Sequence, residues 1–193
     1  MINLKKYLIK EEIGFLRLSD RYRIYNPETG KQVGCAKENQ NVLFKLLRLV
    51  VNKSLLPTSV EIVNESEELI FTIKKSPAFF RAKVEIFDSS RKQIGYFKSK
   101  FLSIGGKFDV FDIRNAKVAE IKGDWKGWNF RFLDEKENEL GSVTKKWAGI
   151  SKELFTSADN YLISINENIS NPTVNVLLLA AGLAVDIVYK ENK

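Results

Sequence analysis

The chain ends in NPTVNVLLLAAGLAVDIVYKENK (residues 171–193), where residues 176–185 run without a single polar side chain. This segment contrasts with the whole chain, in which 28% of the residues are charged. Asn171 is a favourable helix N-cap, and Pro172 fits the first turn, where its missing N–H is not needed. The pattern predicts a helix from 172 to about 189, roughly 27 Å long at about 1.5 Å per residue.

Two interpretations of this apolar helix compete. A membrane-spanning helix needs about twenty mostly apolar residues. Asn175 and Asp186 interrupt the segment, and an Asp near the bilayer centre costs about 2.5–3.5 kcal/mol, so spanning is marginal. A helix that is apolar all round is usually buried in protein, and small side chains at 180, 181, 182 and 184 allow close approach. We therefore expect the helix to form the core rather than an anchor.

Four hairpin-like repeats precede the tail. Each begins with a short strand of alternating polar and apolar residues, followed by an Asn or Asp and a polar turn. An aliphatic residue with Gly or Ala comes next, and a second strand ends on Lys. The repeats are YRIYNPETGKQVGCAK (22–37), VEIFDSSRKQIGYFK (84–98), FDVFDIRNAKVAEIK (108–122) and FRFLDEKENELGSVTK (130–145). Asn26, Asp88, Asp112 and Asp134 are expected to start the turns. The small residues Gly34, Gly95, Ala119 and Gly141 predict a bulge or a close backbone approach.

The number of strands favours a closed barrel. A fifth hairpin without the Gly is predicted at 60–75, and single strands are predicted near 13–18 and at 161–165. The total of about twelve exceeds a usual open sheet, and closure removes the exposed edges. Wall side chains alone do not fill a barrel of this width. We predict a mainly β, single domain over residues 1–193: an antiparallel closed β-barrel of about twelve strands around the central C-terminal α-helix, 172–189.

Composition narrows the chemistry. The 193 residues carry a net charge of +7, which favours anionic partners such as lipid surfaces, acidic proteins or nucleic acid. The lone Cys35 cannot form an internal disulfide, which favours a reducing compartment, and it is expected to be a small core residue. The N-terminal segment lacks the apolar run of a secretory signal. A cytoplasmic protein is the default expectation.

Missing residue types argue against an enzyme. The chain has no His, so Ser-His and Cys-His nucleophile pairs and His-containing zinc sites are excluded. No glycine-rich phosphate loop occurs. We expect no catalytic residue, no cofactor, no metal site and no small-molecule substrate.

One segment breaks the strand pattern and is basic. In NQNVLFKLLRLVVNKS (39–54), Lys45, Arg48 and Asn52 are spaced to share one face of a helix, unless tertiary context makes the segment a strand. A helix there could cap an open end of the barrel, which is the preferred interpretation, or sit on anionic lipid headgroups.

Several segments, in order, resemble the phospholipid-scramblase-like proteins, which share a superfamily with the plant LURP-one-related proteins and the Tubby C-terminal domain. They are KLLRLVVNKSLLP (45–57), GGKFDVFD (105–112), GDWKGWNFRFLD (123–134), KKWAGISKELFTSADNY (145–161) and LLLAAGLAVDIVY (177–189). The resemblance spans roughly residues 20–190. It implies a twelve-stranded antiparallel barrel around a central C-terminal helix, in agreement with the pattern argument.

The resemblance also suggests functions to test. Scramblases are associated with calcium-dependent lipid movement between leaflets, and the corresponding calcium segment is SADNYLISINEN (157–168). A calcium loop needs oxygen ligands at its first, third, fifth and twelfth positions. Ser157, Asp159, Tyr161 and Asn168 stand there with only one carboxylate, so we predict no calcium site.

Tubby domains bind phosphoinositides through basic residues on the barrel surface. By this resemblance the candidate lipid-binding residues are Lys45, Arg48, Lys53, Lys145, Lys146 and Lys152. Trp125 and Trp128 could form an interfacial pair, but a plug at one end of the barrel is preferred.

The functional expectation is a non-enzymatic, scramblase-like protein that meets an anionic phospholipid surface peripherally. Lipid scrambling itself is less expected, because a helix that fills the barrel cannot also line a lipid path. The alternatives are a nucleic-acid-binding or transcription-linked protein, which rests on charge alone, and an interaction scaffold without a ligand.

Overall fold

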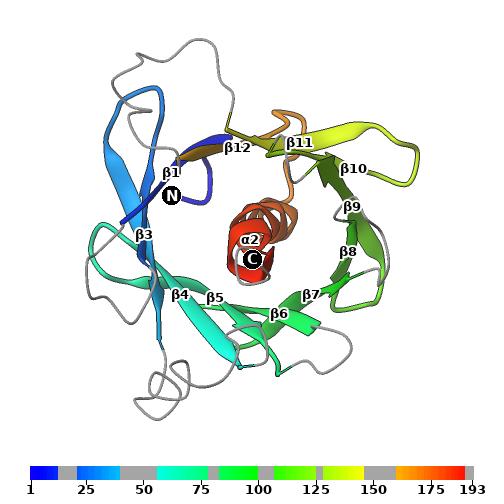
Figure 1. Ribbon diagram of the computed structural model, residues 1–193, viewed down its shortest axis with the longest axis horizontal. Helices are drawn as coiled ribbons and strands as arrows, with labels where there is room; N and C mark the ends of the chain where they lie inside the picture. The colour runs from blue at the N-terminus through cyan, green and yellow to red at the C-terminus, as the bar shows by residue number, and fades with distance from the viewer. Residues whose placement is uncertain are drawn as a thin grey trace.

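The computed structural model describes residues 1–12, 21–39, 56–77, 83–99, 107–124, 128–145 and 160–189. Within these residues, twelve antiparallel strands form a closed barrel, and one α-helix, α2 (Pro172–Tyr189), lies inside the ring (Figure 1). The strands are β1 (Lys6–Glu11), β2 (Arg21–Tyr25), β3 (Gln32–Glu38), β4 (Thr58–Asn64), β5 (Leu69–Lys75), β6 (Lys83–Asp88), β7 (Gln93–Ser99), β8 (Phe108–Asp112), β9 (Lys117–Asp124), β10 (Asn129–Leu133), β11 (Glu139–Thr144) and β12 (Tyr161–Ile165). The predicted fold class is confirmed.

The first strand closes the ring. Each strand from β2 to β12 pairs with its neighbours in sequence, and β1 joins the two ends by pairing with both β2 and β12. Leu8 is opposite Leu162 on one side and Tyr25 on the other. The sequence patterns did not predict β1, and the strand expected near residues 13–18 lies outside the described residues. Charged side chains at Lys6 and Lys10 obscured the alternation of β1.

The tight turns form as the repeats predicted. Asp88 Oδ1 accepts hydrogen bonds from the backbone N–H groups of Ser90 and Lys92, both at 2.9 Å. Asn64, Asp112 and Asp134 make the same pair of bonds, which confirms the fifth hairpin as well. In these four turns the fourth residue has a positive φ of 62–64°; these residues are Glu67, Arg91, Asn115 and Glu137. The Asn26 turn is one residue longer and uses Gly30 there.

Each small residue of the return strands lies where the sheet crowds. Gly95 is opposite Ile86, directly beside a shift in register. A Cβ atom at Gly95 would lie 2.5 Å from the carbonyl oxygen of Phe111 and 2.6 Å from Leu177 Cδ2 of α2. The predicted bulges and close backbone approaches are confirmed, because the glycine lets both the next strand and the helix come near.

The helix is the centre of the core. Residues 176–185 are at most 9% exposed, and Leu177 to Ala181 are fully buried. Asn171 caps α2 through its Oδ1, 2.9 Å from the N–H of Thr173. Because the barrel wall surrounds the helix on every side (Figure 1), an all-round apolar surface is removed from water. The predicted helix bounds, its cap and its place in the core are confirmed.

The N-terminal end of α2 lies at the end of the barrel that carries the five tight turns, here called the tight-turn end. Lys5 donates a hydrogen bond from Nζ to Asn175 Oδ1 at 3.2 Å and another to the carbonyl of Ile169. Asn175, a buried polar residue of the helix, is thereby satisfied. Strands β1, β3, β5, β7, β9 and β11 end at the opposite end of the barrel.

Candidate functional site

The interior of the barrel is almost wholly apolar. Thr58 and Lys75 are opposite each other in the β4–β5 register, at the opposite end from the tight turns, and each is 4% exposed. They alternate with the core residues Val60 and Ile73, so they belong to the inner face of the wall. Among the described residues, no group of three or more His, Cys, Asp or Glu side chains is placed to hold a metal ion.

The described part of segment 157–168, residues 160–168, forms a strand followed by a turn. Tyr161 is the first residue of β12 and lies in the core, whereas Asn168 follows the end of the same strand. The Asn168 N–H donates to Asn166 Oδ1 at 3.0 Å, as in a simple turn. Ser157 and Asp159 lie outside the described residues. The two described positions are therefore at opposite ends of a strand.

Only one of the predicted lipid-binding residues lies in the described part of the chain. The others fall outside it: Lys45, Arg48, Lys53, Lys146 and Lys152. Of the basic segment 39–54, only residue 39 is described. Lys145 follows β11, and its Nζ lies 4.2 Å from the centroid of the Trp128 ring.

The aromatic and thiol groups singled out in the sequence are wholly or partly buried where they are described. Trp128 is half-buried and tilts against Tyr161, with 5.5 Å between ring centroids. It also meets Phe130 edge-on at 6.1 Å, which agrees with a plug at one end of the barrel. Trp125 lies outside the described residues. Cys35 is buried but does not belong to the core cluster, because its strand neighbour Ala36 takes the inward position.

The outer surface of β5 to β8 carries a second set of lysines over aromatic rings. Their strand neighbours Ile73, Val84, Phe97 and Val110 belong to the core, so these side chains face outward. We call this surface the lysine–aromatic face; its residues are Lys74, Lys83, Phe87, Tyr96, Lys98 and Phe111. The three lysines are exposed, Phe87 and Phe111 are half-buried and Tyr96 is 7% exposed.

Each lysine of this face lies over a ring. Lys74 Nζ is 4.8 Å from the Phe87 centroid. Lys98 Nζ is 5.2 Å from both the Tyr96 and the Phe111 centroids, and Lys83 Nζ is 5.4 Å from that of Tyr96. At such distances the ring quadrupole attracts the ammonium group. The rings hold the stems of the lysines against the sheet while the charges stay in water.

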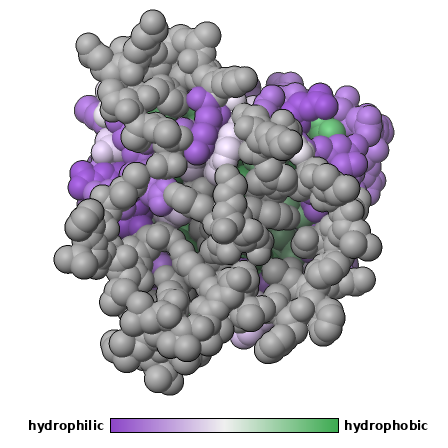
Figure 2. Space-filling model, viewed as in Figure 1, coloured by the Kyte–Doolittle hydropathy of each residue, from purple (hydrophilic) through white to green (hydrophobic). Residues whose placement is uncertain are grey.

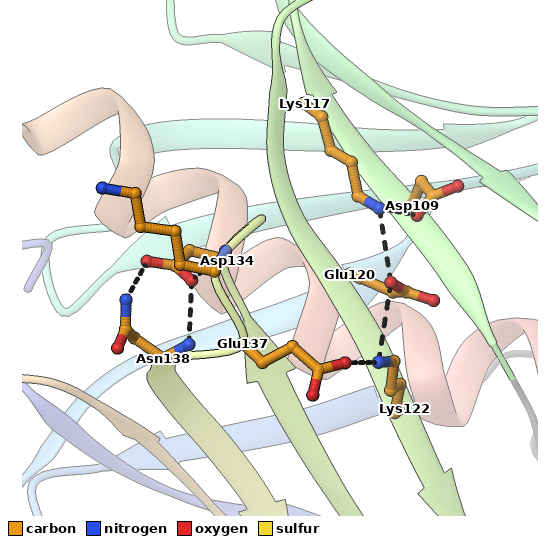
Figure 3. A network of polar contacts seen from close by, with 8 residues as sticks. Asp109, Lys117, Glu120, Lys122, Asp134, Glu137 and Asn138 are labelled. Atoms are coloured by element: carbon orange, nitrogen blue, oxygen red, sulfur yellow. Dashed lines mark hydrogen bonds and ion pairs between the residues drawn. The ribbon is translucent and has the colours of Figure 1, made fainter.

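A chain of ion pairs runs beside the face, across β8, β9 and the β10–β11 turn (Figure 3). Lys117 Nζ lies 2.9 Å from Asp109 and 3.3 Å from Glu120, while Lys122 lies 2.7 Å from Glu137. Partial burial alone would lower the pKa of Lys117, but Asp109 and Glu120 together raise it above its ordinary value. The hydrogen bond from Lys122 lowers the pKa of the Glu137 carboxyl. These charges satisfy one another, and their role is structural.

The lysine–aromatic face keeps an excess of positive charge. Glu85 on this surface pairs with Lys83 at 2.7 Å, and Asp109 pairs with Lys117 of β9. Lys74 and Lys98 are opposite Glu85 and Asp109 in the register, but among the described residues these carboxylates form their salt bridges with Lys83 and Lys117 instead. Hydrophilic side chains also dominate the described surface in the view of Figure 2.

Sequence reasoning missed this face, although a signal for it was present. Tyr96 and Lys98 are two apart in β7, as are Glu85 and Phe87 in β6, so each pair shares one side of its strand. The alternation could have placed each pair on the outside. The cross-strand register needed to join them was not readable from the sequence.

The geometry first defines a class: a twelve-stranded antiparallel barrel packed around its own C-terminal helix, with a basic exterior. The chain belongs to the Scramblase family, which its sequence matches over residues 13–192. It is also 21% identical over 187 residues to a phospholipid scramblase family protein of Schizosaccharomyces pombe. That match covers 90% of this chain and 49% of the yeast protein, so the chain spans about half the length of that relative. No solved structure matches the chain.

Within the described part of the chain, no helix combines the length and the apolar character needed to cross a bilayer.

Proposed function

We propose that this protein binds anionic membrane phospholipids peripherally, as a non-enzymatic member of the Scramblase family in the cytoplasm. The filled interior of the barrel carries the proposal. Because α2 occupies the space inside the wall and Leu177 to Ala181 are fully buried, a ligand must be met on the outer surface. Among the described residues Lys75 is the charged residue that is buried, and the other charged side chains whose burial is described keep contact with water.

The same packing argues against a lipid path through the barrel. A path would require α2 to leave the interior, which would expose residues 176–185 and break the pairing that closes the wall. Opening of this kind costs a free energy comparable to global unfolding. Unpaired strand edges in lipid would add to that cost. Peripheral contact needs no such opening.

Charge and relationship support a lipid surface as the partner. The net charge of +7 favours adsorption to an anionic leaflet. The Schizosaccharomyces pombe relative carries phospholipid scramblase in its name, and we extend to this chain only the contact with phospholipid. Lys45, Arg48, Lys53, Lys145, Lys146 and Lys152 remain proposed contacts, of which Lys145 lies over the Trp128 ring.

Vesicle sedimentation tests the proposal directly. The full chain is mixed with phosphatidylcholine vesicles containing none, a tenth or a third of phosphatidylserine, over a series of salt concentrations. We expect the bound fraction to rise with phosphatidylserine and to fall with salt, because exposed charges are screened over about 10 Å at 0.1 M salt. Pure phosphatidylcholine is the control.

Three outcomes would contradict the proposal. Equal sedimentation with pure phosphatidylcholine would make charge irrelevant. Absence of sedimentation combined with a salt-sensitive shift of DNA or RNA would replace lipid by nucleic acid. Rapid loss of leaflet asymmetry of a fluorescent lipid in vesicles containing the protein would show transport rather than peripheral binding.

A further inference from the structure

Peripheral binding requires one part of the barrel wall to face the bilayer. We propose that the lysine–aromatic face of β5 to β8, together with the turn between β8 and β9, docks on the surface of an anionic phospholipid bilayer. This inference rests on the proposed function and adds the orientation of the barrel. It concerns residues other than those expected from the sequence.

Two lysines of the face are held in an arrangement that favours an added anion. Lys83 and Lys98 are direct partners in the β6–β7 register. Like charges directly opposite each other destabilise a sheet, yet both ammonium groups lie over the ring of Tyr96, at 5.4 and 5.2 Å from its centroid. Glu85 pairs with Lys83, and Asp109, which is opposite Lys98 in the β7–β8 register, pairs with Lys117. Lys98 therefore makes no salt bridge to a carboxylate among the described residues. A phosphate or carboxylate of a lipid headgroup would relieve this repulsion.

The aromatic floor of the face fixes the neighbouring turn. Tyr96 and Phe111 are stacked, with 5.2 Å between their centroids and 15° between their planes. The Tyr96 hydroxyl donates a hydrogen bond to Asn115 Oδ1 at 2.7 Å. Within the turn, Asp112 Oδ1 accepts hydrogen bonds from the backbone N–H groups of Arg114 and Ala116. The turn at 112–116 is therefore held in a defined position relative to Tyr96, the ring that stacks on Phe111 and lies under two lysines of the face.

The tip of that turn carries an apolar group into solvent. Ile113 is 55% exposed and is the exposed large hydrophobic side chain found among the described residues. A single exposed apolar residue needs no explanation by itself. Here Arg114 beside it is exposed too, and the lysine–aromatic face adjoins the turn. An exposed apolar side chain next to a cation can enter the headgroup region of an anionic membrane while the charge stays at headgroup level.

The apolar tip also distinguishes a bilayer from other polyanions. A nucleic acid would be attracted by Lys74, Lys83 and Lys98, but its charged backbone offers no apolar environment for the Ile113 side chain. A bilayer takes both, because the side chain can enter the acyl boundary while the lysines stay at headgroup level. The combination of excess positive charge and the exposed isoleucine favours the bilayer.

Substitutions in the face test the orientation by vesicle binding. On vesicles of phosphatidylcholine with a third of phosphatidylserine, we expect K83Q/K98Q to weaken binding more than tenfold, at about fivefold per lysine. I113S should weaken it several-fold with little change in salt dependence. The control is K10Q. Lys10 Nζ on β1 lies 5.1 Å from the Tyr25 ring centroid, so this substitution removes a lysine–aromatic contact of the same kind elsewhere on the barrel. We expect K10Q to bind like the unchanged protein.

A reporter on the tip tests insertion independently. The buried Cys35 stays unlabelled in the folded protein, so I113C can carry an environment-sensitive dye. The control E135C places the dye at the same position of the β10–β11 turn. We expect vesicles to shift the emission to the blue at 113 and leave it unchanged at 135. All variants are first matched for circular dichroism and melting temperature.

The outcomes separate the two proposals. Undiminished vesicle binding by K83Q/K98Q, or a dye at 113 that stays in water while the protein sediments, would overturn the orientation and leave peripheral binding standing. Failure of the unchanged protein to bind vesicles would overturn both. If K10Q weakened binding by the same factor per lysine as K83Q/K98Q, the attraction would be diffuse with no preferred face, which would also overturn the orientation.

Discussion

Ile163 of β12 packs against the bare surface that Gly182 leaves on α2. A Cβ atom built at residue 182 would lie 2.7 Å from Ile163 Cδ1 and 2.9 Å from its Cγ1. Both residues are deep in the core, and Ile163 is fully buried. The contact shows why a glycine sits in the middle of a buried helix, where it has a poor intrinsic propensity: the wall approaches the helix axis too closely for a methyl group.

Replacing this glycine tests how tightly the helix fills the barrel. Gly182→Ala gains about 1 kcal/mol of helix propensity but overpacks the contact at a cost of about 1–3 kcal/mol. We expect a net loss of about 1 kcal/mol in the free energy of unfolding, measured by urea denaturation. Ile163→Val removes the nearest atom, so the double variant should lose less than the sum of the two single ones. Strict additivity would contradict the contact.

A charge in the buried helix tests whether α2 is the core. Leu183 is fully buried, so Leu183→Asp places an unpaired carboxylate among apolar side chains. We expect a loss of more than about 3 kcal/mol, measured by chemical denaturation. Thr173→Asp is the matched control, because Thr173 is exposed in the first turn of the same helix, where a negative charge is favourable.

Removal of the helix tests the same point by a different route. A chain without residues 172–193 should fail to fold, because the wall would enclose an empty apolar space. Circular dichroism and gel filtration would detect the loss. A truncated chain that stays monomeric and melts cooperatively would contradict the assignment of α2 to the core.

The β6–β7 turn holds a residue with an unfavourable backbone conformation. Arg91 has a φ of 63°, a region that costs L-residues about 1–2 kcal/mol and glycine almost nothing. Replacing Arg91 by glycine relieves this strain, but part of the benefit is lost because glycine also raises the conformational entropy of the unfolded chain. We expect Arg91→Gly to raise the free energy of unfolding by about 0.5–1 kcal/mol. Ser89→Gly, at a turn position without positive φ, should lower it.

The carboxylate that starts the β10–β11 turn makes stability depend on pH. Hydrogen bonds from the Asn138 side chain and backbone, and from the Lys136 N–H, lower the pKa of the Asp134 carboxyl below its ordinary value of 3.8. A group whose pKa is lower in the folded state stabilises the fold above its ordinary pKa, and that contribution is lost as the pH falls through the folded value. The melting temperature should therefore drop more steeply below pH 4 in the unchanged protein than in Asp134→Asn. Equal slopes would contradict the shift.

The local signals in the sequence were sufficient for the turns and for the helix. An Asx residue bonds N–H groups two and four positions ahead, as Asp88 does with Ser90 and Lys92. The Asn171 cap acts within three residues of itself. Such bonds depend only on nearby residues, so composition and spacing suffice to predict them. The uninterrupted apolar run at 176–185 likewise indicated burial on all sides.

Tertiary structure alone decided which distant residues meet. The closing strand β1 was missed because its role depends on partners at both ends of the chain, and Lys5 reaches Asn175 across 170 positions. Tyr96 finds Asn115 nineteen positions away only because β7 and β8 pair in one register. A strand's own pattern says which side chains share a side of the sheet. The lysine–aromatic face exists because the register of four strands, fixed by the closed barrel around α2, brings those sides together.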